Sequence, residues 1–97
     1  MNLILHHEAA EEMTESAIYY ATKVPGLGDD FLASVDTAFD QILAAPDCWR
    51  AIAADVRRYL MPRFPFGILY QIRSDYIQIV AISHFSRHPD YWKYRIE

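Results

Sequence analysis

The stretch FGILYQIRSDYIQIVAIS, residues 66–83, decides the fold. Two runs rich in β-branched and aromatic residues flank Ser74-Asp75, which predicts a hairpin of strands 66–73 and 76–83 joined by a two-residue turn. Counting outward from that turn gives the expected cross-strand pairs: Ile72 with Ile77, Tyr70 with Ile79, Ile68 with Ala81, and Phe66 with Ser83.

The two faces of this hairpin differ in character. Side chains alternate along a strand, so the pairs above predict one face that is almost wholly apolar and receives the covering layer of the fold. The other face is mixed and continues into His84, and we expect it to line a partly open groove. It carries Gly67, Leu69, Gln71 and Arg73 opposite Ile82, Val80, Gln78 and Tyr76.

Two amphipathic helices are predicted before the hairpin. In residues 8–24 and again in residues 28–45, apolar side chains recur every three or four positions. Pro25-Gly26 ends the first helix and Pro46 ends the second. Because the break between them is short, the helices should be antiparallel neighbours.

The remaining segments complete the predicted topology. Residues 2–6 have strand character, 46–56 are interpreted as a connecting loop, and 57–63 as a strand whose Pro62 indicates an edge or a bulge. Pro89 favours a short C-terminal turn or helix. Residues 1–97 then form a single domain of the α+β class, in the order β-α-α-β-β-β. An N-terminal helical hairpin packs on one face of an antiparallel sheet.

Composition narrows the class of protein. With 97 residues and 53% hydrophobic content the chain is one globular domain rather than a disordered segment. Cys48 is the single cysteine, so no internal disulfide can form. We see no signal peptide and no apolar run long enough to span a bilayer. The expectation is a soluble, cytoplasmic protein that does not engage a membrane.

Charge is divided unevenly along the chain. Residues 1–55 hold ten acidic and two basic residues, a balance of −8, while residues 56–97 hold three acidic and seven basic ones, a balance of +4. The second half can therefore offer a local positive surface to an anionic partner. The overall charge of −4 argues against a strong nonspecific nucleic-acid binder.

Several segments together resemble the RelE/ParE toxin superfamily of type II toxin–antitoxin systems. They are YYATKVPGLGDDF (19–31), the pair Arg57-Arg58, RFPFGILYQI (63–72) and AISHFSRHPDYWKYR (81–95). The combination of PGLG, RFP-F-I-Y and H-x-x-R-x-P-x-Y-W covers nearly the whole chain in the family's order. It is most similar to the ParE-like, plasmid-stabilisation branch.

The resemblance implies a growth-inhibiting toxin that is neutralised by a cognate antitoxin, with a homodimer or a heterotetramer with the antitoxin among the expected assemblies. ParE-like members poison DNA gyrase, whereas RelE-like members cleave mRNA in the ribosomal A site without a metal. Net charge −4 and only two lysines favour the gyrase branch. The ribosome-dependent endonuclease is the alternative, and a RelE/ParE-fold interaction protein without toxicity is a third.

The C-terminal motif supplies the candidate catalytic residues for the nuclease alternative. There, His84 would be a general acid or base, Arg87 a phosphate clamp, and Tyr91 a stacking or proton-donating group. Two other interpretations remain open, namely contact with antitoxin or target and a purely structural role.

The candidate residues for binding target or antitoxin are Arg57, Arg58, Arg63, Trp92 and Arg95. Alternation sends Arg57 and Arg58 to opposite faces, so only one of them can point into the groove beside His84. We expect acidic antitoxin residues to contact the arginine-rich half, although solvated strand charges are an equal alternative.

No metal or cofactor is expected, because the four histidines lack a cysteine or carboxylate cluster at ligand spacing. Cys48 is interpreted as a buried or incidental thiol rather than a nucleophile. The acids Glu8, Glu11, Glu12 and Glu15 are most simply a solvated helix face, with docking of a basic partner as the alternative.

Overall fold

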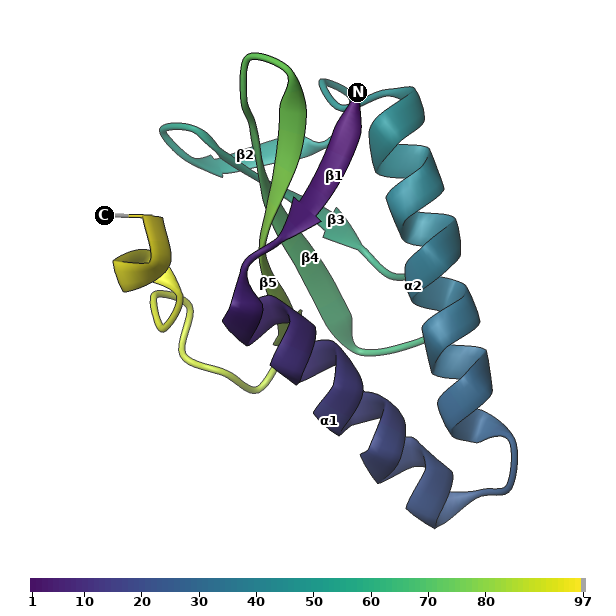
Figure 1. Cartoon of the computed structure of the whole chain (residues 1–97). Helices are drawn as coiled ribbons and strands as arrows, with labels where there is room; N and C mark the ends of the chain where they lie inside the picture. Colours follow the sequence, from purple (N-terminus) through teal and green to yellow (C-terminus); the bar gives the residue numbers. More distant parts are fainter. Residues whose placement is uncertain (97) are drawn as a thin grey trace.

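The computed structural model describes residues 1–96, in which two helices pack on one sheet (Figure 1). The elements in chain order are β1 (Asn2–Leu5), α1 (His7–Lys23), α2 (Leu27–Ala44), β2 (Arg50–Ala53), β3 (Val56–Leu60), β4 (Phe66–Ile72), β5 (Tyr76–His84) and the 3₁₀-helix η1 (Lys93–Ile96). The predicted helices, hairpin and C-terminal helical turn are confirmed, and so is the α+β class. None of the helices within these residues is long and apolar enough to cross a membrane.

The sheet has the strand order β1-β5-β4-β3-β2, with β1 parallel to β5 and all other pairs antiparallel. The prediction of a wholly antiparallel sheet is therefore wrong at β1. α2 ends near the N-terminus, beside the start of β1 (Figure 1), and the chain then enters β2 on the opposite edge of the sheet. Three further reversals then make β5 parallel to β1.

Residues 50–53, which we predicted to be loop, form the edge strand β2. This strand pairs Arg50 with Arg58 and Ala51 with Arg57, followed by an irregularity before Ala53. Its side chains are mostly exposed, so no apolar alternation marks it in the sequence.

The central hairpin follows the predicted register only near its turn. Ile72 pairs with Ile77 and Tyr70 with Ile79, as expected. Beyond them a bulge between Leu69 and Tyr70 shifts the pairing, so that Ile68 meets Ile82 and Phe66 meets His84. The predicted partners Ala81 and Ser83 are wrong, because the extra residue in the bulged strand exchanges the two faces.

The main core lies between the sheet and the helices. Apolar side chains of both helices meet those of β3, β4 and β5, with Phe31, Val35, Ile68, Tyr70 and Ile79 among the most deeply buried. The helices cross closely at Gly28, where an added Cβ would stand 2.5 Å from the carbonyl oxygen of Ala17. Glycine at this position therefore permits the tight helical hairpin.

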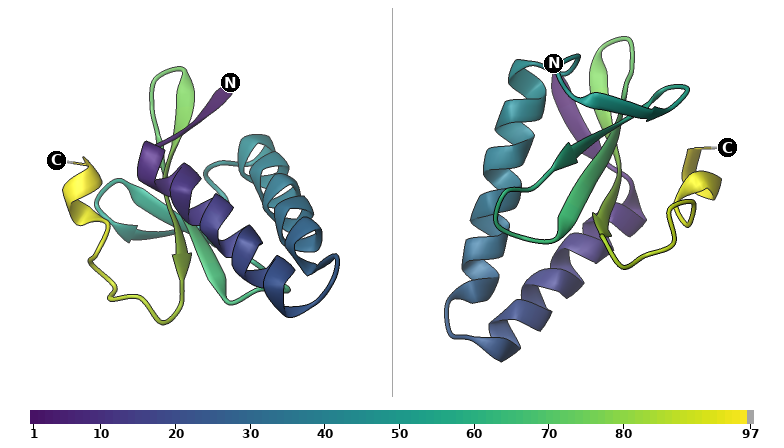
Figure 2. Two further views of the ribbon diagram at one scale, coloured as in Figure 1. Left: turned by 60° about the horizontal axis from the view of Figure 1, so that its bottom comes forward. Right: turned by 180° about the vertical axis from the view of Figure 1, so that it is seen from behind.

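A second, smaller core occupies the opposite face of the sheet. Trp92 packs there with Val56, Leu69, Val80 and Ala81. The C-terminal segment, yellow in Figure 2, lies on the side of the sheet away from α2. The face predicted to be mixed and open is thus partly covered, and Ile82, which we had placed on it, belongs to the main core.

Candidate functional site

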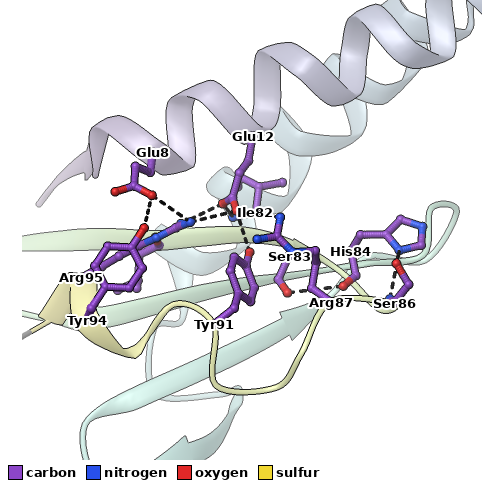
Figure 3. Close-up of polar contacts among 11 residues, drawn as sticks. Glu8, Glu12, Ile82, Ser83, His84, Ser86, Arg87, Tyr91, Tyr94 and Arg95 are labelled. Carbon is purple, nitrogen blue, oxygen red and sulfur yellow. Dashed lines mark hydrogen bonds and ion pairs between the residues drawn. The ribbon is translucent and has the colours of Figure 1, made fainter.

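Glu12, on the second turn of α1, is the centre of a polar network that ties this helix to β5 and the C-terminal segment (Figure 3). Its Oε1 accepts hydrogen bonds from the backbone N–H of Ile82 at 3.0 Å and from Nη1 of Arg95 at 2.9 Å. Its Oε2 accepts from the Tyr91 hydroxyl at 2.7 Å and from Nη2 of Arg95 at 3.0 Å. The side chain is only 13% exposed, so the expectation of a solvated acid is wrong at this position.

Arg95 is the buried cation of the network, with its side chain 3% exposed. Besides the fork to Glu12, its Nη1 donates to the carbonyl oxygen of Val80 at 3.0 Å, and its Nη2 lies 3.4 Å from Glu8. Burial lowers the pKa of the Arg95 guanidinium, but hydrogen bonds with Glu12 and Tyr94 raise it above its ordinary value. Arg95 therefore stays charged and serves to fasten the C-terminal segment.

Tyr91 packs between this network and Arg87. The Arg87 guanidinium lies over the Tyr91 ring, 3.9 Å from its centroid, and its Nη1 is 3.9 Å from Oε2 of Glu12. Burial, followed by the hydrogen bond to Glu12, raises the pKa of Tyr91 to about 12. The hydroxyl is therefore neutral at physiological pH, and its O–H group already donates a hydrogen bond to Glu12.

His84 ends β5 and lies at the mouth of two surface hollows. Its Nδ1 lies 3.0 Å from the Ser86 backbone N–H, which donates to it, and 2.8 Å from the Ser86 hydroxyl, while its ring meets Phe66 edge-on at 5.0 Å. His84 and Arg87 line the same hollows. The backbone N–H of Arg87 donates to the carbonyl oxygen of His84 at 3.0 Å. Within residues 1–96, however, no side-chain hydrogen bond connects His84 to either Arg87 or Tyr91. The three predicted catalytic residues thus lie in the same region, but their side chains are not connected by hydrogen bonds along which a proton could move.

A concavity of about 380 Å³, which we call the sheet groove, opens beside β4 and the C-terminal segment. Arg58, Arg87 and Lys93 surround it, and Leu69 and Trp92 form part of its apolar wall. An added Cβ at Gly67 would stand 3.1 Å from Cγ and Cδ of Arg58, so the absence of a side chain there lets the Arg58 stem lie on the strand.

The other predicted binding arginines lie elsewhere. Arg57 points away from Arg58, as alternation predicted, and its Nη1 donates to the carbonyl oxygens of Trp49 at 2.8 Å and Asp47 at 3.2 Å. Arg63 stands 3.7 Å from Asp30 on α2. Trp92 is buried and donates to the carbonyl oxygen of Pro89 at 2.7 Å. The structure therefore brings only Arg58 and Trp92 of the five candidates to the sheet groove.

Many of the opposite charges of the two halves pair with each other within the chain. Ion pairs connect acids of the first half to arginines of the second: Asp30 to Arg63, Asp47 to Arg57, Glu12 to Arg87, and both Glu8 and Glu12 to Arg95. The expected positive surface is consequently smaller than the charge count suggests, and Arg58, in the sheet groove, is one of the exposed arginines that remain outside these ion pairs.

The chain is similar to a solved structure described as "Chromosomal ParDE TA system from P. aeruginosa", with a TM-score of 0.64 and 20% sequence identity, over 87% of this chain and 95% of that chain. The chain has a ParE-like fold. No protein-family model matches it, and no curated protein matches it either.

The ParE-like fold confirms the predicted architecture. It does not assign a role to any site residue, and each role must be argued from the contacts of that residue. Sequence reasoning missed Glu12 and Glu8 as members of the site. The signal available in the sequence was the charge asymmetry between the two halves. In the structure, acids on the first turns of α1 contact arginines and tyrosines that lie more than seventy residues later in the chain. Sequence spacing alone could not pair them, because the parallel placement of β1 beside β5 was not foreseen.

One further group of potential metal ligands lies at the start of α1. Ligand atoms of His6, His7 and Glu8 all lie within 4.8 Å of one another. Glu8 already pairs with Arg95 and accepts a hydrogen bond from the Tyr94 hydroxyl, and the Arg95 charge repels a cation. The group is therefore poorly suited to hold a metal.

Proposed function

We propose that this protein is the toxin component of a type II toxin–antitoxin system, a cytoplasmic growth inhibitor that is neutralised by a cognate antitoxin. The ParE-like fold supports this assignment, since the similar solved structure is described as a ParDE TA system. Within that assignment we favour inhibition of DNA gyrase by binding over cleavage of RNA. A role in plasmid stabilisation would follow from the same activity.

The observation that carries the preference for binding is the hydrogen bond from Tyr91 to Glu12. A nuclease that acts without metal needs a positioned proton donor and mobile cations near the scissile phosphate. Here the Tyr91 hydroxyl is committed to a carboxylate and Arg95 is 3% exposed. These groups support the fold of the C-terminal segment instead of facing a substrate.

One specific observation favours the ribosome-dependent endonuclease as the second candidate. Arg58, His84 and Arg87 line the same groove, which gives two cations and one titratable ring at one surface. Such a set can clamp a phosphodiester and move a proton if a substrate brings the groups into reach.

Induction of the chain without antitoxin in bacterial cells tests the proposal. We expect growth arrest, filamentation and double-strand DNA breaks with intact mRNA, and purified chain should inhibit supercoiling by purified gyrase. Codon-phased mRNA cuts that disappear in both His84→Ala and Arg87→Ala would select the endonuclease. Normal growth of cells that accumulate folded chain would refute toxicity and leave an interaction protein.

A further inference from the structure

We infer that the sheet groove binds an acidic peptide segment in which a carboxylate stands next to an apolar side chain. The inference rests on the proposed function in one respect, because the cognate antitoxin is then the protein that supplies this segment. It narrows the expected contact surface from the whole arginine-rich half to one groove.

Arg58 provides the cationic group for the carboxylate. Within the described part of the chain no acidic side chain lies at ion-pair distance from Arg58, whereas Arg57 and Arg63 each have such a neighbour. Arg58 is exposed, and its stem lies over Gly67, which directs the side chain along the sheet surface. A partner carboxylate would satisfy this guanidinium through charge-assisted hydrogen bonds.

The far side of the groove adds positive charge. Arg87 is 52% exposed, and its contact with Glu12 is long, at 3.9 Å. Among residues 1–96, Asp90 is the acidic residue that lines the groove, and it is already paired with Lys93 at 3.1 Å. The groove is therefore net positive although the whole protein carries −4.

The remaining wall of the groove is apolar. Leu69 and Trp92 form buried parts of it, and the exposed side chains of Ile52 and Phe85 border it. A cavity of about 380 Å³ can accept one large apolar side chain beside a carboxylate. Binding hot spots in protein interfaces commonly combine a buried apolar anchor with a neighbouring polar contact.

Two observations favour a peptide over single-stranded RNA as the occupant. The overall charge of −4 opposes RNA, which carries a charge at every phosphate, more than a short peptide with one or two carboxylates. Bases also need open aromatic faces on which to stack, and Trp92 is 3% exposed while Phe85 alone of the groove's aromatic residues is open.

Binding of defined probes to the purified chain tests the inference. The probes are short fluorescent peptides with a Leu or Phe flanked by glutamates, matched peptides with glutamine in place of glutamate, and a short single-stranded RNA. We expect the acidic peptides to bind best, with an affinity that falls as salt rises. Arg58→Gln should weaken this binding by about tenfold, the equivalent of losing one favourable charged contact.

Arg73→Gln is the matched control, because it removes the same charge from an exposed arginine outside the groove. It should change the affinity far less than Arg58→Gln, and circular dichroism should show that both variants are folded. In NMR spectra of the unmodified chain, the acidic peptide should shift the amide signal of Gly67 and the indole signal of Trp92.

Equal binding of the glutamate and glutamine peptides would overturn the inference. So would tighter binding of the RNA, or no peptide binding at millimolar concentration. Failure of the proposed function is separately visible: a chain that binds acidic peptides but never slows growth keeps the groove assignment and loses the toxin assignment. A chain that arrests growth without binding them gives the reverse result.

Discussion

The hydroxyl group of Tyr91 donates a 2.7 Å hydrogen bond to Oε2 of Glu12, and the two residues are 79 positions apart in the chain. This contact fastens the C-terminal segment to the second turn of α1. The same carboxylate also holds the Arg95 guanidinium and the backbone N–H of Ile82. One acidic side chain therefore determines where three separate parts of the molecule meet, and the first predictions concern this network.

Replacement of Glu12 should destabilise the protein strongly. Glu12→Ala leaves the buried Arg95 without its principal counter-charge, and removal of one member of such a pair typically costs about 3–5 kcal/mol in the free energy of unfolding. Urea denaturation followed by circular dichroism measures this loss. Glu11→Ala, one position earlier on the exposed side of α1, should change the stability by no more than about 0.5 kcal/mol. Similar losses for the two variants would contradict the role given to Glu12.

Two tyrosines should titrate late. Burial raises the pKa values of Tyr70 and Tyr91 to about 12, and the hydrogen bond to Glu12 contributes at Tyr91. An ultraviolet titration of the folded protein should show two tyrosines that ionise only near pH 12. Tyr91→Phe should remove one late transition, whereas Tyr19→Phe, at an exposed position, should leave both late transitions in place.

These raised pKa values make stability depend on pH in a defined direction. Between the ordinary tyrosine pKa of about 10 and the folded value of about 12, the folded state binds more protons than the unfolded state. The contribution of Tyr91 is therefore complete below pH 10 and is lost as pH rises toward 12. Urea midpoints measured across this range should fall less steeply for Tyr91→Phe than for the unmodified chain, and parallel curves would count against the assignment.

The crossing of the two helices should not tolerate a larger residue at position 28. Gly28→Ala places a Cβ 2.5 Å from the carbonyl oxygen of Ala17, so the helices must separate, at a cost of about 1–3 kcal/mol for an overpacked contact. The denaturation midpoint measures the effect. Ala33→Ser changes a neighbouring exposed position of the same helix and should leave the midpoint nearly unchanged. An unaltered midpoint for Gly28→Ala would show that the helices pack more loosely than described.

The C-terminal segment should depend on Trp92 for its attachment to the sheet. Trp92→Ala removes the largest side chain of the second core, where it packs on Leu69 and Val80, and truncation of a buried tryptophan costs about 3–5 kcal/mol. The amides of residues 91–96 should then exchange their hydrogens faster, because the segment is no longer held on the sheet. The sheet groove also loses the wall that Trp92 forms. Phe85→Ala, at a side chain that is 57% exposed, should leave exchange in that segment unchanged.

Helices, strands and the covered face followed from the sequence where one periodicity continued without interruption. Phe31, Val35 and Ile42 form one stripe of α2, and all three are buried as that stripe requires. The hairpin register was correct as far as Tyr70 and Ile79 because the turn determines it. The bulge beyond them has no residue signature in this chain, so every pair after it was misplaced by one position.

The parts that were missed depend on contacts between distant segments. Glu12 lies on the polar face of its helix, where acidic side chains are ordinarily solvated. Nothing in the local sequence therefore distinguishes it from Glu11. Its burial results from the placement of residues 91–95 against α1. Arg58, by contrast, was correctly separated from Arg57, because strand alternation alone places them on opposite faces.

The parallel pairing of β1 with β5 also limits how the molecule can form during synthesis. Leu3 is synthesised 74 residues before Ile77, its neighbour in the sheet. The place between β1 and β4 therefore stays vacant until β5 has been made, and a product that terminates before β5 lacks the strand that joins β1 to β4. Whatever the finished protein does to a cell, its incomplete nascent forms should be inert.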